Sequence, residues 1–150
     1  RNWFADNCAE KHSGLINTAE FQTGMQEVFL ANSRLDLRRG RFDIAQKTVA
    51  NYLRMHPRDA RAYYLLGEIL MQRDDQEDAR SAARYFEKAI LLDPNYSEPH
   101  KAMGLIHYKD GEKQLAKKFF ESCLLLSPND ADNAYIREYL KNLQPNGEES

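Results

Sequence analysis

Apolar residues recur along the chain with the spacing of helices that bury one face. Between residues 82 and 90, gaps of four, three and one positions place the apolar side chains on one side of a helix: Ala82, Phe86, Ala89 and Ile90. Asp93 and Pro94 then end this helix, because proline cannot continue the hydrogen-bond ladder and disfavours a helical residue before it. An apolar face of this kind needs another helix to cover it.

Residues 23–57 contain a complete helical hairpin, that is, two helices joined by a turn. Thr23 and Gln26 fit a capping box, which predicts that a helix begins at Thr23. Gly40 is placed to end that helix in the left-handed conformation, and a second helix then runs from Phe42 to the terminating Pro57. The unit is therefore helix, glycine turn, helix and proline.

The same unit occurs three times. Pro57, Pro94 and Pro128 close the copies at intervals of 37 and 34 residues. Small residues in the first helix of each copy recur at intervals of 34 and 37 residues, at Ser33, Gly67 and Gly104. A fixed period in this range, with one helix pair per copy, is typical of a helical solenoid.

The third copy, residues 97–130, carries the most complete set of landmarks. These landmarks are Met103, Gly104, Gly111, Ala116, Phe120 and Pro128. By its length and by the spacing of these residues, the third copy resembles a tetratricopeptide repeat. The second copy, residues 60–96, has three extra residues in the connector around residues 74–78. Its matching landmarks are Leu66, Gly67, Ala82, Phe86, Ala89 and Pro94. The first copy, residues 26–59, matches through Gly40, Phe42, Ala45 and Pro57.

The first copy also departs from the family pattern at two positions. Ser33 stands where glycine is usual, and Tyr52 stands where a small residue is usual. We therefore expect looser packing between the first helix pair and the second.

The resemblance implies an all-α fold, an α-solenoid of three helix hairpins with a C-terminal capping helix. The expected domain covers residues 26–143, with repeats at 26–59, 60–96 and 97–130 and the capping helix at 131–143. Residues 1–25 are expected to be an N-terminal lead, either a short helix that covers the first apolar edge or residual sequence of a preceding domain. Within it, Trp3, Phe4 and Cys8 fall on one helical stripe. Residues 144–150 are expected to be a flexible tail. The residues expected to hold the repeats together are Gly67, Ala82, Phe86, Pro94, Gly104, Ala116, Phe120 and Pro128.

The resemblance also implies that the first helix of each pair lines a concave groove. The groove residues expected to bind a partner are Arg34, Arg38, Arg61, Tyr64, Glu68, Met71, Lys101, Leu105, Tyr108 and Tyr135. Tyrosine, arginine and methionine are enriched at protein interfaces, which agrees with this role. A well-known subclass of the family grips a terminal carboxylate through lysines and asparagines, but here those places hold Leu30, Arg34, Tyr64, Leu65, Glu98 and Ala102.

Charge and composition narrow the range of partners. The formal net charge is -2, with an isoelectric point near 6.1, so nothing electrostatic favours a nucleic acid or an anionic membrane. No run of eighteen apolar residues exists, and we expect no direct insertion into a membrane. Two cysteines, Cys8 and Cys123, are too few for a disulfide framework and lack metal-ligand spacing, and Cys123 is expected to be a buried thiol.

No constellation of residues predicts catalysis, a metal or a cofactor. His100 and His107 coincide with aromatic landmark positions of the repeat, so both are expected to pack against neighbouring helices. The acidic run at residues 74–78 lacks the glycine and the distal glutamate of a calcium loop. We therefore expect that the chain is not an enzyme.

The function that follows is a non-enzymatic scaffold that binds a partner peptide or helix in the groove. An alternative is the regulatory or recruiting C-terminal region of a larger enzyme, such as a membrane-associated metallopeptidase. A third possibility, RNA binding through related helical repeats, is disfavoured by the acidic balance of the chain. The terminal repeat edges could also pair two copies, and the style of the repeats suggests a bacterial protein of the cytoplasm or periplasm.

Overall fold

The structure, a computed structural model, describes residues 18–73 and 76–145. These residues form seven helices and no strand, which confirms the all-α prediction. The helices are α2 (Thr18–Arg38), α3 (Phe42–Met55), α4 (Ala60–Arg73), α5 (Gln76–Leu92), α6 (Ser97–Lys109), α7 (Lys113–Leu126) and α8 (Asn133–Asn142).

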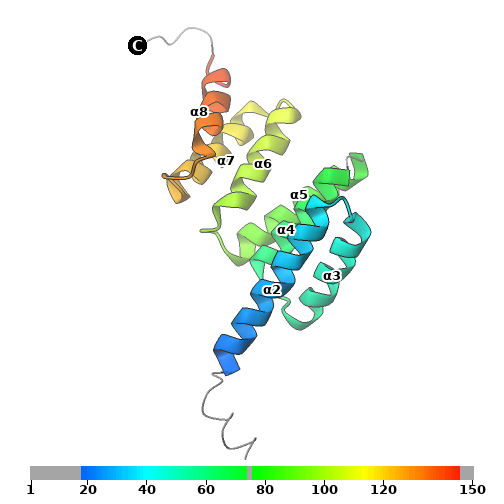
Figure 1. Ribbon diagram of the computed structural model, residues 1–150. Helices are drawn as coiled ribbons and strands as arrows, with labels where there is room; N and C mark the ends of the chain where they lie inside the picture. The colour runs from blue at the N-terminus through cyan, green and yellow to red at the C-terminus, as the bar shows by residue number, and fades with distance from the viewer. Residues whose placement is uncertain (1–17, 74–75, 146–150) are drawn as a thin grey trace, which may run out of the picture.

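The helices stack as consecutive hairpins, as Figure 1 shows. Helix α2 packs on α3, α4 on α5, and α6 on α7, so each predicted repeat is one hairpin. The hairpins meet where α3 contacts α4 and where α5 contacts α6, and α8 packs on α7 at the C-terminal end. The prediction of three stacked hairpins followed by a capping helix is confirmed.

The predicted start of the first helix is wrong. Helix α2 already begins at Thr18, so Thr23 lies inside the helix and the expected boundary between residues 25 and 26 falls within it. The Gln26 side chain, expected to reach back to the capping residue, instead lies 3.2 Å from His56 at the end of α3. The stripe expected around Trp3 and Cys8 lies outside the described residues.

The predicted glycines lie in the turns within hairpins, and the predicted prolines follow the second helices. Gly40 and Gly111 adopt positive φ angles of 72° and 78°, the left-handed conformation that glycine accepts without strain. The second helices of the first and third pairs stop shortly before Pro57 and Pro128. The three extra residues of the second copy lengthen α5, which has 17 residues, whereas α3 and α7 have 14.

A glycine faces a phenylalanine inside the second and third hairpins. A Cβ atom added to Gly67 would lie 2.7 Å from Phe86 Cδ1, and one added to Gly104 would lie 2.6 Å from Phe120 Cδ1. Both phenylalanines are at most 1% exposed, and Ala82 and Ala116 beside them are fully buried. The rings therefore lie against bare backbone, which fixes how closely the two helices approach.

The first hairpin uses a different pair of residues at the same two positions. Ser33 replaces the glycine, is 1% exposed, and donates a hydrogen bond to the Phe29 carbonyl oxygen at 3.0 Å. Val49 replaces the phenylalanine and is fully buried. Serine is larger than the glycine of the other hairpins and valine is smaller than their phenylalanine, so the two changes compensate in volume.

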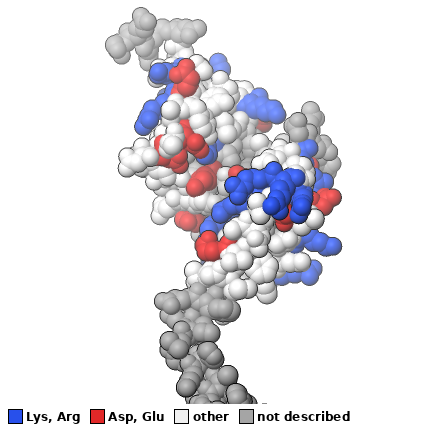
Figure 2. Space-filling model, viewed as in Figure 1, with Lys and Arg blue, Asp and Glu red and all other residues white. Residues whose placement is uncertain are grey.

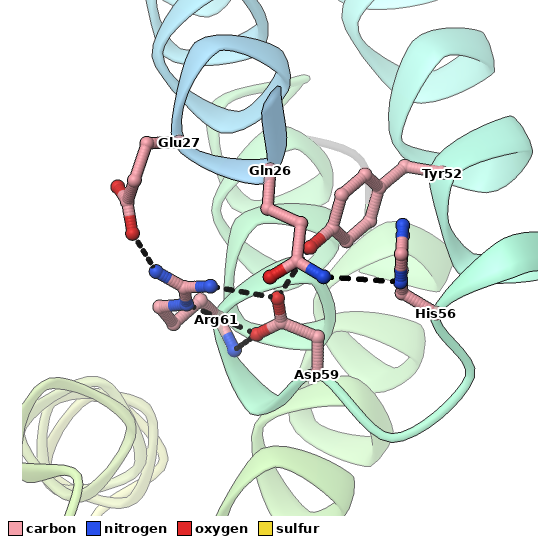
Figure 3. Close-up of polar contacts among 6 residues, drawn as sticks. All are labelled: Gln26, Glu27, Tyr52, His56, Asp59 and Arg61. Carbon is pink, nitrogen blue, oxygen red and sulfur yellow. Dashed lines mark hydrogen bonds and ion pairs between the residues drawn. The ribbon is translucent and has the colours of Figure 1, made fainter. Parts of the chain in front are cut away.

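Tyr52 seals the junction between the first and second hairpins, contrary to the expectation of looser packing. Its ring is 1% exposed and its hydroxyl donates a hydrogen bond to Asp59 Oδ2 at 2.5 Å (Figure 3). Arg61 binds the same carboxylate through its backbone N–H at 3.0 Å, Nε at 3.1 Å and Nη2 at 3.0 Å. Arg61 also contacts Glu27 on α2, so this network joins the first three helices.

Electrostatics hold the Asp59 carboxylate in its charged form. Burial alone would raise its pKa, but the hydrogen bonds from Arg61 and Tyr52 outweigh burial and lower the pKa below its ordinary value of 3.8. Burial and the same carboxylate raise the pKa of Tyr52, so that phenol stays a hydrogen-bond donor. The network is therefore intact at neutral pH.

His100, His107 and Cys123 pack as predicted. His107 stacks on Phe119 at 5.4 Å between ring centroids, and His100 lies 6.1 Å from the same ring. Cys123 is buried, has no disulfide partner among the described residues, and has a thiol pKa raised by burial. Cys8 lies outside the described residues.

Phe86→Ala should lower the free energy of unfolding by about 3–5 kcal/mol, because it removes a buried ring and leaves a cavity against Gly67. Urea denaturation followed by circular dichroism would measure the loss. Leu91→Ala is the matched control on the same helix: this side chain is 74% exposed, and its removal should change stability by less than about 0.5 kcal/mol. Equal losses in the two variants would contradict the packing described above.

Asp59→Asn should destabilise the protein by about 2 kcal/mol at pH 7, because it removes a charged acceptor shared by Tyr52 and Arg61. The folded pKa of Asp59 is lowered, so its stabilisation is complete above the ordinary value of 3.8 and is lost as pH falls through the folded pKa. Melting temperatures of both proteins from pH 7 to about pH 2 should therefore converge in acid. A gap that stays constant over this range would show that the charge of Asp59 is not involved.

Candidate functional site

The first helices of the hairpins share one side of the molecule. Helix α2 contacts α4, and Tyr64 on α4 lies 5.3 Å from the ring of Tyr96, which immediately precedes α6. Helix α6 meets α8 through Tyr108 and Tyr139, whose ring centroids are 4.6 Å apart. We call the side formed by α2, α4, α6 and α8 the first-helix face.

A polar and aromatic cluster occupies the middle of the first-helix face. Tyr64 donates a hydrogen bond to Glu68 at 2.7 Å and packs its ring against Tyr96. Glu98 lies near both phenols, and Arg34 from α2 lies near Tyr96. Three successive hairpins therefore contribute to one cluster of half-buried side chains.

The charges of this cluster are acidic on balance. Burial, followed by the carboxylates of Glu68 and Glu98, raises the pKa of Tyr64. Burial and Glu98 also raise the pKa of Tyr96, although the guanidinium of Arg34 works in the opposite direction. Two carboxylates and one guanidinium thus surround two neutral phenols.

A second cluster lies where α6 meets α8. Lys101 donates a hydrogen bond to Asp132 at 2.8 Å, and Tyr135 stands beside them with 38% of its surface exposed. Burial opposes the charge of Lys101, but Asp132 and the neighbouring Tyr135 outweigh it and raise the pKa of the ammonium group. Lys101 is therefore a fixed cation at this end of the first-helix face.

The ten residues expected to bind a partner do not all share one environment. Arg34, Tyr64 and Glu68 lie together in the middle cluster, and Lys101 and Tyr135 lie together in the second. The other five differ from these and from one another. Arg38 is exposed at the end of α2, Arg61 is held by Asp59 and Glu27, and three side chains pack partly against the core: Met71, Leu105 and Tyr108.

Sequence reasoning missed three members of these clusters. Tyr96 and Asp132 lie just before α6 and α8, outside the helical positions that the family pattern assigns to the groove. The family pattern places Glu98 at a position of the carboxylate clamp and gives it no other role. The signal that could have found Tyr96 is its place two residues after Pro94, where the chain turns back toward the first-helix face.

A shallow depression at the hairpin junction is not an equivalent candidate. Its lining includes Gln26, His56, Asp59, Arg61 and Asp93. Four of these side chains already make the hydrogen bonds shown in Figure 3, with one another and with Tyr52 and Glu27. Polar groups that are paired within the protein have little left to offer a ligand.

Basic and acidic side chains both occur over much of the described surface in Figure 2, with local gatherings of each sign. Basic side chains gather over the C-terminal end of α2, where Arg38 and Arg39 are exposed. Acidic side chains gather toward the beginnings of α6 and α8, where Glu98 and Asp132 lie.

The described residues contain no group of three or more His, Cys, Asp or Glu side chains that could hold a metal ion. Among the same residues, no helix is both long and apolar enough to cross a membrane.

Comparisons with solved structures give the same fold. The type III secretion translocator chaperone SycD of Yersinia enterocolitica has a TM-score of 0.69 at 13% identity, covering 81% of this chain and 84% of that one. PcrH, solved with the chaperone-binding region of PopD, has a TM-score of 0.64 at 19% identity, covering 81% and 92%. The TPR2B domain of yeast Sti1, solved in a complex with pHsp70, has a TM-score of 0.63 at 17% identity, covering 77% and 96%.

Comparisons of the sequence itself identify the family. No curated protein is similar enough in sequence to count as a relative of this chain. Two family models, each described as a tetratricopeptide repeat, match residues 30–84 and 102–130. Together they cover more than half of the 150 residues, and they fall on the hairpins seen in the structure. The chain therefore belongs to the tetratricopeptide repeat family.

Proposed function

We propose that this protein is a non-enzymatic interaction scaffold, and that its first-helix face is a concave groove that receives a peptide or helix from a partner protein. The observation that carries the proposal is the middle cluster, in which side chains from three hairpins meet without being buried in the core. Half-buried tyrosines offer contact area at low entropic cost, and the carboxylates and guanidinium beside them offer directional bonds.

The cluster is suited to binding because its side chains are already ordered. Tyr64 is fixed by Phe86, whose ring centroid lies 5.6 Å away, by Tyr96, and by its hydrogen bond to Glu68. A surface that is ordered before binding loses less entropy when a partner arrives. The partner would cross the middle cluster and reach Lys101 and Tyr135 at the second.

Two of the structural neighbours support this proposal by example. PcrH was solved with a region of PopD, and the Sti1 domain in a complex with pHsp70. Both share the fold of this chain over at least 77% of its length. We propose the same general mode of action, with a different ligand chemistry, because the positions of the carboxylate clamp hold Arg34, Tyr64 and Glu98.

Peptides selected from a display library on the intact chain should bind the first-helix face. Tyr64→Ala and Tyr108→Ala should each weaken a selected peptide by about tenfold or more, because each removes an aromatic contact. Isothermal titration calorimetry would measure the affinities, and circular dichroism would show whether each variant remains folded.

Leu91→Ala and Leu125→Ala provide the control, because both leucines are more than 70% exposed and lie on second helices. They should leave affinity unchanged. Selected peptides that respond to Leu91 and Leu125 but not to Tyr64 and Tyr108 would overturn the proposal.

A further inference from the structure

The first helix of the stack has an apolar face that no other described helix covers. Met25, Val28 and Leu35 are 44%, 53% and 37% exposed, which is unusual for three large apolar residues on one helix. Their spacing of three and seven residues places them on one side of α2. Gly24 and Ala31 are exposed on the same side, and we call these five residues the outer face.

The opposite side of α2 already has its partners. Leu30, Ser33 and Leu37 are at most 4% exposed and pack into the first hairpin. The exposed apolar residues therefore do not belong to a face that the hairpin could bury by a small rotation of the helix. Covering them requires another element on the outside of the stack.

Helix α2 also extends beyond the hairpin that holds it. Figure 1 shows its N-terminal turns projecting past the end of α3. Gln26 is the residue that meets His56 at that end, and a Cβ atom added to Gly24 would touch nothing within 4 Å. Isolated helical turns are marginal in water, so a partner that packs along them would stabilise them.

The outer face is suited to a second copy of itself in the antiparallel direction. When the two helices are aligned about the middle of this face, Leu35 of one copy lies opposite Gly24 of the other, and Val28 lies opposite Ala31. Two of the three large side chains then meet a small one, which permits a close approach of the two helices. The third, Met25, lies level with Arg34, whose side chain belongs to the middle cluster instead. None of the five residues of the outer face is charged. Asn32 follows Val28 by four residues and lies within the same stripe, but it is an uncharged amide, so its burial does not bury a charge.

Charge disfavours the parallel alternative. Arg38 and Arg39 are exposed at the C-terminal end of α2, and Figure 2 shows basic side chains gathered there. Parallel pairing would place the two arginine pairs side by side, whereas antiparallel pairing puts them at opposite ends of the interface. Glu27, in the other half of the helix, would then lie closer to the arginines of the second copy.

We propose that two copies of this chain associate through the outer faces of α2, with the helices antiparallel about a two-fold axis that passes between residues 29 and 30. Such an interface is isologous, since each copy offers the same patch. The outer face has five residues, compared with roughly 20–30 residues on each side of a standard interface, so we infer a monomer–dimer equilibrium rather than a permanent dimer. The inference is independent of peptide binding, because it uses a different surface.

Sedimentation equilibrium of the full chain between about 1 and 300 µM should show this equilibrium. Val28→Glu should weaken dimerisation by roughly tenfold or more, because it places a carboxylate in the apolar contact. Leu91→Glu is the control: it adds the same charge at a side chain that is 74% exposed on α5, and it should leave the dissociation constant unchanged. Circular dichroism would confirm that both variants are folded.

Disulfide trapping would test the direction of pairing. In a Cys8→Ser background, Gly24→Cys and Leu35→Cys should cross-link to each other in an equimolar mixture, and neither should cross-link when oxidised alone. Self-linking of Leu35→Cys alone would overturn the antiparallel arrangement. A chain that stays monomeric throughout the concentration range would overturn the dimer and leave residues 1–17 or another protein as the cover of this face.

Discussion

The structure depends on the contact between a glycine on one helix and a phenylalanine on the next. At Gly67 and Gly104 the absence of a side chain lets an aromatic ring lie against the backbone, and this sets the distance between the helices of a hairpin. Because the same contact occurs in the second and third hairpins, the two have similar shapes and can stack in series. In the first hairpin, Ser33 and Val49 occupy the same two positions and are also buried.

Regular stacking has a direct consequence for the surface. When each hairpin presents its first helix on the same side, side chains that are far apart in sequence are brought into one row. Arg34, Tyr64 and Tyr96 meet in this way, although more than sixty positions separate the first from the last. The surface that we propose for binding is therefore a product of the repeat, and no single hairpin could form it.

Most of the architecture could be predicted from the sequence, because the period, the glycines and the prolines act locally. The turn at Gly40 follows from the local sequence, and the turn at Gly111 and the glycine contacts follow from the places of these residues in the repeat pattern. The polar network of Tyr52 could not be predicted in this way. Tyr52 is a large residue at a position where the family usually has a small one, so a comparison of repeat positions interprets it as a defect in packing. In the structure its hydroxyl donates a hydrogen bond to Asp59.

The proposed binding surface was harder to predict for a related reason. Periodicity assigns positions within helices, but Tyr96 and Asp132 lie in the segments just before α6 and α8, where the period does not apply. Arg61 shows the opposite error, since its position faces the expected groove while its guanidinium is occupied by Asp59 and Glu27. Whether a side chain is already hydrogen-bonded to its neighbours depends on the three-dimensional structure and cannot be inferred from its position in the repeat.

The longer α5 shows where this architecture can accept change. Its three additional residues lie before Ala82, so the alanine, Phe86 and the terminating Pro94 keep the spacing found in the third copy. Length variation at that end of a hairpin leaves the stacking contacts in register. The connector between α4 and α5 is thus the natural location for an engineered insertion, such as an epitope or a fluorophore attachment site.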